Sequence, residues 1–241
     1  MPPTAPTTTP TLPPPGATAS KFPATGTAEP TCPPTPTKNE EPLTTTRNPN
    51  NILWVDYEAT GLMNNPFTVP LEGAAIITDG DLNELAVLEG IAIHATEEEL
   101  SYMSDFVLDM HTKTGLLDKV RASTVTRDDF DATIKNFAAP YFPTKGEEIF
   151  DGSKYRGMII GGNSVKFDFA VMEKFLPQTL SNMDYRVIDI SSLGELFRRW
   201  AYDYWKAMPP KLSDHTALTD IRAGVNELRY YRAGMHLLAP Q

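Results

Sequence analysis

Two acidic residues that follow an apolar run are the first candidates for chemistry. Asp56 and Glu58 flank Tyr57 directly after residues 52–55, Ile-Leu-Trp-Val, a run typical of a buried strand. Alternate side chains of a strand share a face, so the two carboxylates project together about 7 Å apart. Like charges at a buried edge are costly unless a cation neutralises them. Because such a pair also occurs at solvated strand ends, it predicts a cation site only in the company of further ligands.

Three more groups of suitable chemistry stand where elements are expected to begin or end. Asp168 follows an expected strand, and Asp220 lies near the start of the last expected helix, five residues after His215. Each has a structural alternative, as a carboxylate that complements a helix dipole, an ion-pair partner or a neighbour of a helix cap. Together, the four carboxylates and the imidazole match two-metal phosphodiester hydrolysis. That reaction needs hard oxygen ligands for two divalent ions about 4 Å apart and a base for the attacking water.

The remaining pattern predicts the strands and helices that must bring these groups together. Three apolar segments at 52–55, 73–78 and 85–94 predict a meander of strands. The hydrophobic period then changes, and helices are predicted at 97–103, 104–111, 114–121 and 127–142, the last begun by Thr126. Strands at 156–161 and 187–190 alternate with helices at 166–176, 191–205 and 215–236. This order predicts an α/β fold in which helices pack on a mixed sheet.

The first 50 residues differ in composition from the rest. The 241-residue chain contains 22 prolines, and most of them lie among threonines before residue 51. Such a segment cannot bury enough apolar surface to offset the entropy lost on ordering. We therefore expect a disordered Pro/Thr-rich leader at 1–50 and one folded domain at 51–241. A Pro-rich ligand for a partner, or an organelle address, is the functional alternative for the leader.

Charge and cysteine content narrow the class of protein. The net charge of −10 belongs to residues 51–241, because acids and bases balance in the leader. An acidic domain argues against binding of long nucleic acid through phosphate contacts, which Lys and Arg provide.

The single cysteine, Cys32, predicts neither an intramolecular disulfide nor a disulfide-linked partner. No apolar run suits a bilayer, so no membrane partner is expected. The Arg-poor leader is unlike a transit peptide, which favours a cytoplasmic location and leaves a mitochondrial one open.

Three motifs occur in order along this chain. They are residues 55–62 (VDYEATGL), Gly162-Asn163-Ser164 before Asp168, and His215-x-Ala217-x-x-Asp220-Ile221-Arg222. With these motifs, the sequence from about Asn51 to Arg232 resembles the oligoribonucleases of the DEDDh 3′-to-5′ exonuclease superfamily. The resemblance implies a ribonuclease H-like fold. Its mixed five-stranded sheet combines a three-stranded antiparallel meander with parallel strands and is flanked by helices.

The resemblance also implies roles for the acidic residues and the imidazole. Asp56, Glu58, Asp168 and Asp220 would bind two divalent ions, Mg²⁺ or Mn²⁺, and His215 would be the general base. The residue types suit these roles, because histidine titrates near neutral pH and can accept a proton from an activated water. The implied reaction releases 5′-mononucleotides from the 3′ end of very short RNA, especially dinucleotides.

A closed phosphate cap would restrict the substrate to short oligonucleotides. The resemblance assigns this cap to Ser164, Arg186 and Ser191, with Tyr185 contributed by the partner of a homodimer. Arginine suits the task, because its planar fork pairs with two phosphate oxygens. Without the resemblance, a surface ion pair is an equal interpretation of Arg186.

Three further residues match family positions near the nucleotides. Leu62 and Phe106 are candidates for contact with the bases, since apolar and aromatic faces stack on any base. His111 matches a position beside the nucleotides. The structural alternatives are a core position for Leu62 and Phe106, and a buried structural histidine for His111.

The sequence departs from the family pattern at a few positions, and two rival functions share the motifs. Ala59 and Thr219 replace the usual residues, phenylalanines flank Asp168, and 145–156 resembles an insertion. One rival is a DEDDh DNA exonuclease that acts on longer single strands. The other is a catalytically silent nucleotide-binding protein on the same fold, since a fold does not fix a function.

Overall fold

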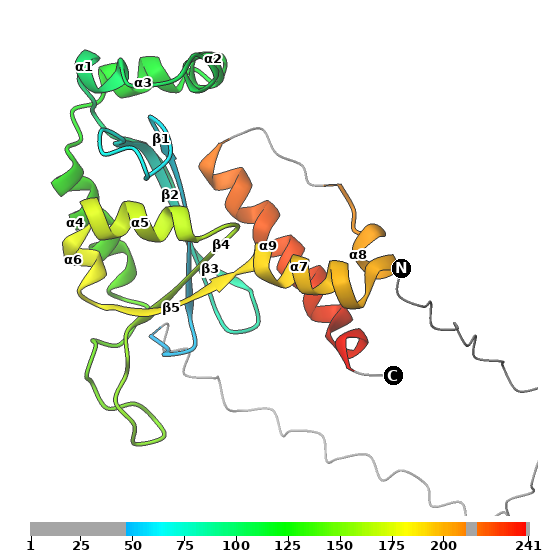
Figure 1. Cartoon of the computed structure of the whole chain (residues 1–241). Helices are drawn as coiled ribbons and strands as arrows, with labels where there is room; N and C mark the ends of the chain where they lie inside the picture. Colours follow the sequence, from blue (N-terminus) through cyan, green and yellow to red (C-terminus); the bar gives the residue numbers. More distant parts are fainter. Residues whose placement is uncertain (1–46, 211–215, 240–241) are drawn as a thin grey trace, which may run out of the picture. The chain divides into compact units, whose positions relative to one another are not determined.

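The described part of the chain consists of residues 47–210 and 216–239 in a computed structural model (Figure 1). These residues belong to one of the two units into which the chain divides, residues 44–241. Residues 1–46 of the predicted leader lie outside the described part of the chain, so the disorder of the leader stays a prediction. None of the described helices is both long and apolar enough to cross a bilayer.

Five strands form one mixed sheet at the centre of this unit. The strands are Ile52–Ala59 (β1), Pro70–Thr78 (β2), Glu84–Ala92 (β3), Met158–Gly162 (β4) and Met183–Asp189 (β5). The first three pair antiparallel as a meander, whereas β4 pairs parallel with β1, and β5 pairs parallel with β4. The order across the sheet is therefore β3-β2-β1-β4-β5. The predicted α/β fold with its mixed five-stranded sheet is confirmed.

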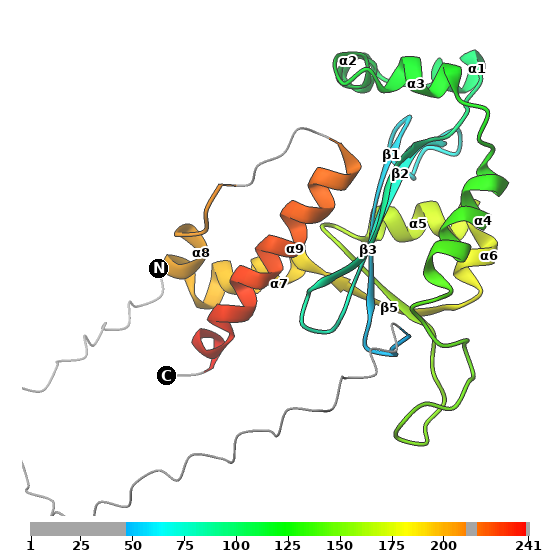
Figure 2. The same ribbon diagram turned by 180° about the vertical axis from the view of Figure 1, so that it is seen from behind.

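Helices cover both faces of the sheet and one of its ends. One face carries α4 (Arg127–Ala138), α5 (Lys166–Phe175) and α6 (Pro177–Leu180), and the other carries α7 (Ile190–Trp200) and α9 (Ala217–Gly234), as Figures 1 and 2 show. The end toward which β1 runs carries α1 (Glu97–Leu100), α2 (Asp105–Lys113) and α3 (Leu116–Ala122). Two short elements, α8 (Tyr202–Lys206) and the 3₁₀ turn η1 (Met235–Leu238), adjoin α7 and α9. The central strand β1 thus has a helical layer on each side.

The alternation of β1 supplies two hydrophobic cores. Val55 and Tyr57 enter the core shared with α4 and α5, whereas Trp54 enters the core shared with α7 and α9. The Trp54 indole N–H donates to Thr78 Oγ1 at 2.9 Å. Gly161 of β4 allows the close approach of this ring, because a Cβ there would overlap it. Since strand side chains alternate, the next even-numbered positions of β1 continue the face beneath α9.

Several element boundaries differ from prediction for local reasons. The helix that begins at Arg127 ends at Ala138, close before Pro140, which has no backbone N–H with which to continue the helical hydrogen bonds. The long helix predicted after β5 is divided at Ala201, whose φ of −143° is not helical. Pro177 ends α5 as predicted but also begins α6, since proline is tolerated at the first helical position. None of these differences moves the acidic residues.

Candidate active site at the end of strand β1

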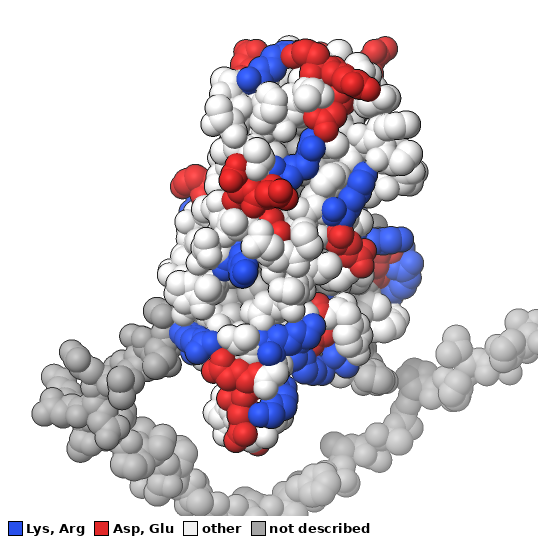
Figure 3. All heavy atoms as spheres, turned by 90° about the vertical axis from the view of Figure 1, so that its left-hand side faces the viewer, with Lys and Arg blue, Asp and Glu red and all other residues white. Residues whose placement is uncertain are grey.

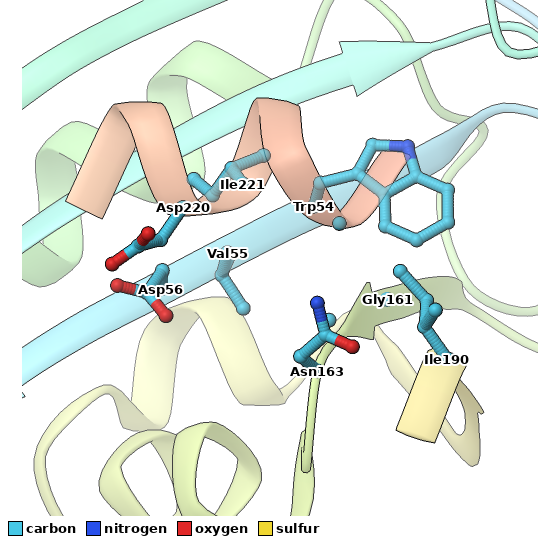
Figure 4. Close-up of a pocket in the computed structure, with 10 residues that line it drawn as sticks. Trp54, Val55, Asp56, Gly161, Asn163, Ile190, Asp220 and Ile221 are labelled. Atoms are coloured by element: carbon cyan, nitrogen blue, oxygen red, sulfur yellow. The ribbon is translucent and has the colours of Figure 1, made fainter. Parts of the chain in front are cut away.

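Three predicted carboxylates converge where β1 passes beneath α9. Asp56, Glu58 and Asp220 are partly buried, and each offers a carboxylate oxygen within 4.8 Å of those of the other two. The first two lie on one face of β1, and the third lies in the first turn of α9. Figure 4 shows the Asp56 and Asp220 carboxylates pointing toward one another. Residues far apart in the sequence therefore form one acidic cluster.

The fourth predicted carboxylate approaches β1 from α5. Asp168 lies in the first turn of that helix, and only 3% of its surface is exposed. Its Oδ1 accepts a hydrogen bond from the backbone N–H of Tyr57 at 3.2 Å. That bond fixes Asp168 beside the strand residue between Asp56 and Glu58. Asp168 thus adjoins the three-carboxylate cluster.

Burial and mutual repulsion strongly disfavour the charged forms of these acids. Burial, together with the charges of Asp168, Glu58 and Asp220, raises the pKa of Asp56 to about 8. The pKa of Asp168 is raised to about 7, because burial outweighs the lowering effect of hydrogen bonds from the backbone of Tyr57 and of Asp168 itself. A cation among these oxygens would relieve both effects. Hard carboxylate oxygens are the ligands that Mg²⁺ and Mn²⁺ prefer, so the residues fit such an ion.

A cavity beside the acidic cluster gives access to it. The cavity has a volume of about 220 Å³ and is lined by Asp56, Asp220, Trp54, Asn163 and Ile190, among other residues (Figure 4). A water molecule in the liquid occupies about 30 Å³, so the cavity has room for a small polar group with several waters. The carboxylates are therefore open to a ligand on this side.

Two of the predicted phosphate-cap residues meet at the ends of β4 and β5. The Ser164 backbone N–H donates to Asp189 Oδ1 at 3.0 Å and to Ser191 Oγ at 2.9 Å, and the two serine hydroxyls are 3.2 Å apart. Ser164 has a φ of 54°, in the left-handed region that few non-glycine residues adopt. Asn163, whose side chain also contacts Ser191, lines the cavity. The structure therefore places this serine pair next to the cavity.

The other two predicted cap residues form a separate pair on the edge strand β5. Tyr185 is exposed, and the Arg186 guanidinium lies over its ring at 4.4 Å from the ring centre. Arg186 also contacts the buried carboxylate of Asp184, with Nη1 3.4 Å from Oδ1. Arg156 approaches the other oxygen of Asp184 at 3.1 Å. Within the described residues, Arg186 is thus anchored to Asp184 and not to the serine pair.

The predicted base-contacting residues occupy the end of the molecule near α2. Leu62 and Phe106 are 70% and 76% exposed, so neither is a core residue. In contrast, His111 is 1% exposed, and its Nε2 lies 3.0 Å from the Ala59 carbonyl oxygen at the end of β1. Burial lowers the pKa of His111. The histidine therefore anchors α2 to the strand that carries the acidic cluster, as its structural alternative anticipates.

One predicted group falls outside the structure, and two contributors to the site were not predicted. His215 lies among residues 211–215, outside the described part, so its role as general base stays a prediction. Glu72 of β2 lies opposite Glu58, and Asn163 lines the cavity. Glu72 directly precedes the predicted strand 73–78. This position next to a predicted strand is the sequence signal that could have indicated Glu72 as a contributor to the site.

Charged side chains are interspersed on the face covered by α4 and α6. Figure 3 shows Lys and Arg of the described residues alternating with Asp and Glu on this face. A long nucleic acid bound through its phosphates would favour a continuous basic band. This face therefore offers no support for such a binding mode.

Comparison with known sequences identifies relatives over most of the chain. A model of the family described as Exonuclease matches residues 53–228. The oligoribonuclease of Nocardia farcinica is 35% identical over 189 residues, which cover 78% of this chain and 82% of that protein. The oligoribonuclease of Mycobacterium ulcerans is 37% identical over 181 residues, which cover 75% and 79%.

Comparison with solved structures identifies the same fold in a larger protein. The E. coli exonuclease I complex with a 5cy-dT13 oligonucleotide matches 78% of this chain with a TM-score of 0.56 and 17% identity. The match covers 42% of that protein, so this chain spans less than half its length. At this level of identity the likeness extends to the fold alone.

Proposed function

This chain belongs to the oligoribonuclease family of exonucleases, and we propose that it removes 5′-mononucleotides from the 3′ end of very short RNA, especially dinucleotides. The family assignment rests on the matches over residues 53–228 and on the identity to oligoribonucleases of similar length. The proposal extends the activity in the names of those relatives to this chain. It makes the protein a phosphodiester hydrolase.

The convergence of Asp56, Glu58 and Asp220, with Asp168 beside them, is the observation that carries this proposal. The four acids would hold two divalent ions, Mg²⁺ or Mn²⁺. Such ions, when bound, supply acidification of the attacking water and stabilisation of charge on the attacking and leaving oxygens. The carboxylates would hold the ions in fixed positions, because α9 and α5 hold Asp220 and Asp168 against β1.

His215 would accept the proton of the attacking water. It precedes Asp220 by five residues, just before the described start of α9 at Ala217. The imidazole pKa lies near neutral pH, which suits a general base at that pH. Replacement of His215 by Asn is therefore expected to lower kcat with little change in the affinity for the metal.

The substrate would be short because both of its ends meet fixed groups. The serine pair Ser164 and Ser191 offers hydroxyls beside the cavity, and Arg186 offers a guanidinium for the 5′ phosphate. Exposed Phe106 and Leu62 are available to the bases. In this arrangement Tyr185 would contact the substrate bound by the partner of a homodimer. Such an interface is supported by the exposure of Tyr185 on the edge strand β5 and by the exposure of Trp200.

The test is the turnover of a labelled RNA dinucleotide with and without EDTA. We expect mononucleotide release that EDTA abolishes and that added Mg²⁺ or Mn²⁺ restores. Light scattering on the same sample measures the oligomeric state, and a strict monomer with full activity would contradict the role of Tyr185 in trans. Undiminished turnover in EDTA would contradict the metal-dependent mechanism.

The rival function, a DNA exonuclease acting on longer strands, is favoured only by the fold shared with exonuclease I. A substrate ladder separates the two functions. We expect faster cleavage of the RNA dinucleotide than of single strands of about 20 nucleotides. The reverse order, with DNA preferred, would favour the rival. Unchanged hydrolysis after Asp56→Ala would show that the observed activity does not come from this site. That result would favour a catalytically silent nucleotide-binding role for the protein.

A further inference from the structure

An exposed aromatic pair joins the two segments that carry the proposed base-contacting residues. The rings of Phe67 and Tyr102 are stacked, with their centres 4.5 Å apart and an angle of 10° between their planes. Phe67 lies in the connection between β1 and β2, and Tyr102 lies in the turn between α1 and α2. The two residues are 54% and 39% exposed, and neither belongs to a hydrophobic core of the described part of the chain. The pair is therefore a contact between two surface segments.

Hydrogen bonds within the first segment fix Leu62 relative to Phe67. The Thr68 hydroxyl donates to the Leu62 carbonyl oxygen at 2.8 Å, and the Asn65 N–H donates to the same oxygen at 3.0 Å. The Phe67 N–H donates in turn to Asn65 Oδ1 at 3.0 Å. Lys174 of α5 ties this segment to the sheet layer, because its ammonium donates to the Thr68 carbonyl oxygen at 3.1 Å. A displacement of Phe67 would therefore displace Leu62.

The second segment leads directly into α2, which carries Phe106 in its first turn. Ser104, two residues after Tyr102, caps this helix with its side chain. At the other end of α2, the buried His111 contacts the Ala59 carbonyl oxygen at 3.0 Å. The aromatic pair thus ties the first turn of α2 to the β1–β2 connection, whereas His111 ties its last turn to β1.

We propose that Phe67 and Tyr102 are positioning residues that clamp the β1–β2 connection to the start of α2 and thereby fix the spacing between Leu62 and Phe106 for the bases of the substrate. Bases stack on apolar and aromatic faces, so the contact depends on where these faces are held. Faces that are already in place lose less conformational freedom when the substrate binds. This inference rests on the proposed function, which assigns Leu62 and Phe106 to the bases.

Two substitutions of Tyr102 test the clamp. Tyr102→Ala removes the ring that stacks on Phe67, whereas Tyr102→Phe keeps it. For Tyr102→Ala we expect KM for the RNA dinucleotide to rise about 2- to 10-fold, the factor that corresponds to one aromatic pair, with little change in kcat because the acidic cluster is untouched. Amide hydrogen exchange at 62–68 and 105–108 is expected to accelerate. Tyr102→Phe is expected to keep the KM and the exchange of the unmodified chain.

A double-mutant cycle tests whether the clamp acts through Phe106. Phe106→Ala removes the face that the clamp holds in place. Tyr102→Ala should therefore change KM by a smaller factor in the Phe106→Ala protein than in the unmodified chain. Equal factors in the two backgrounds would overturn the positioning role.

The ring pair of Phe137 and Tyr141 provides a matched control. It lies at the C-terminal end of α4, with ring centres 6.4 Å apart. Phe137→Ala is expected to lower the melting temperature without changing KM or the exchange at 62–68. An equal rise of KM in Phe137→Ala would overturn the inference, by showing a general loss of stability.

Failure of this inference differs from failure of the proposed function. A Tyr102→Ala protein with the KM of the unmodified chain would overturn the clamp, whatever its exchange. If the unmodified chain does not cleave the dinucleotide, the proposed function fails, and exchange still tests the clamp. In that case, unchanged exchange at 62–68 and 105–108 in Tyr102→Ala would overturn it.

Discussion

Two acidic residues of this protein, Asp131 and Asp56, have opposite surroundings. At the junction of α4 and α6, the Asp131 carboxylate accepts N–H groups from Gln178 at 2.8 Å and Thr179 at 2.9 Å, and the Thr179 hydroxyl at 2.7 Å. At the end of β1, Asp56 is surrounded by other carboxylates, which raise its pKa together with burial. The fold supplies donors to the first acid, whereas it gathers negative charge around the second.

This difference separates a structural acid from a proposed metal ligand. Hydrogen bonds to a charged acceptor contribute about 1.5–3 kcal/mol each, so the fold itself compensates the burial of Asp131. The repulsion in the acidic cluster at Asp56, in contrast, would be relieved by a bound cation. Loss of the acid should therefore have opposite effects on stability at the two places.

The largest expected effect concerns activity. Asp56→Asn removes a charged ligand, so we expect kcat/KM for the RNA dinucleotide to fall by more than about 100-fold, the upper range for loss of an outer-shell partner. Asp131→Asn should keep the activity per folded molecule, as measured by initial rates. Comparable losses of activity in Asp56→Asn and Asp131→Asn would contradict the different roles assigned to the two acids.

The next effect is the pH dependence of stability in the absence of metal. Between about pH 4 and pH 8, the unfolded chain binds fewer protons at Asp56 and Asp168 than the folded protein, because their pKa values are raised to about 8 and about 7. The free energy of unfolding must then decrease as pH rises through this window. One pKa unit corresponds to about 1.4 kcal/mol, so the decrease amounts to several kcal/mol.

Urea unfolding at a series of pH values in EDTA measures this decrease. Added Mn²⁺ should restore more stability at pH 8 than at pH 5, because the ion competes with fewer protons there. A metal-free protein that becomes more stable from pH 5 to pH 8 would contradict the assigned pKa shifts.

A moderate loss of stability is expected at the helix cap. Asp131→Ala leaves the N–H groups of Gln178 and Thr179 without their acceptor, so we expect the free energy of unfolding to fall by about 1.5–3 kcal/mol. Denaturant titration measures this change. An unaffected Asp131→Ala protein would show that α6 is held by packing alone.

The smallest expected effect is a gain of stability at the acidic cluster. Asp56→Asn removes one of the repelling charges, although the buried amide partly offsets the gain. We expect the metal-free melting temperature at pH 8 to rise by about 2–4 °C, which corresponds to about 1 kcal/mol in a domain of this size. Thermal unfolding in EDTA tests it, with Asp131→Asn as the control of opposite sign. A lower melting temperature for Asp56→Asn would show that Asp56, like Asp131, stabilises the metal-free fold.

Local patterns predicted most elements of the fold. The run before Asp56 predicted β1, and Thr126 predicted the start of α4, where it forms a capping box with Asp129. The predictions missed the early residues of β5 and the break at Ala201. Both depend on partners distant in the sequence, since β5 is ordered by pairing with β4. Exposure of Leu62 and Phe106 and burial of His111 were left open, because single apolar or aromatic residues have no period from which to infer a face.

The sequence by itself determined which groups are available, because the spacing of Asp56 and Glu58 on one face of a strand is a local property of the chain. Their partners were decided by the tertiary structure. Packing of α9 and α5 against β1 brings Asp220 and Asp168 to this strand, and burial there raises the pKa values of Asp56 and Asp168. Distances between elements and exclusion of water arise from packing, which no local pattern encodes.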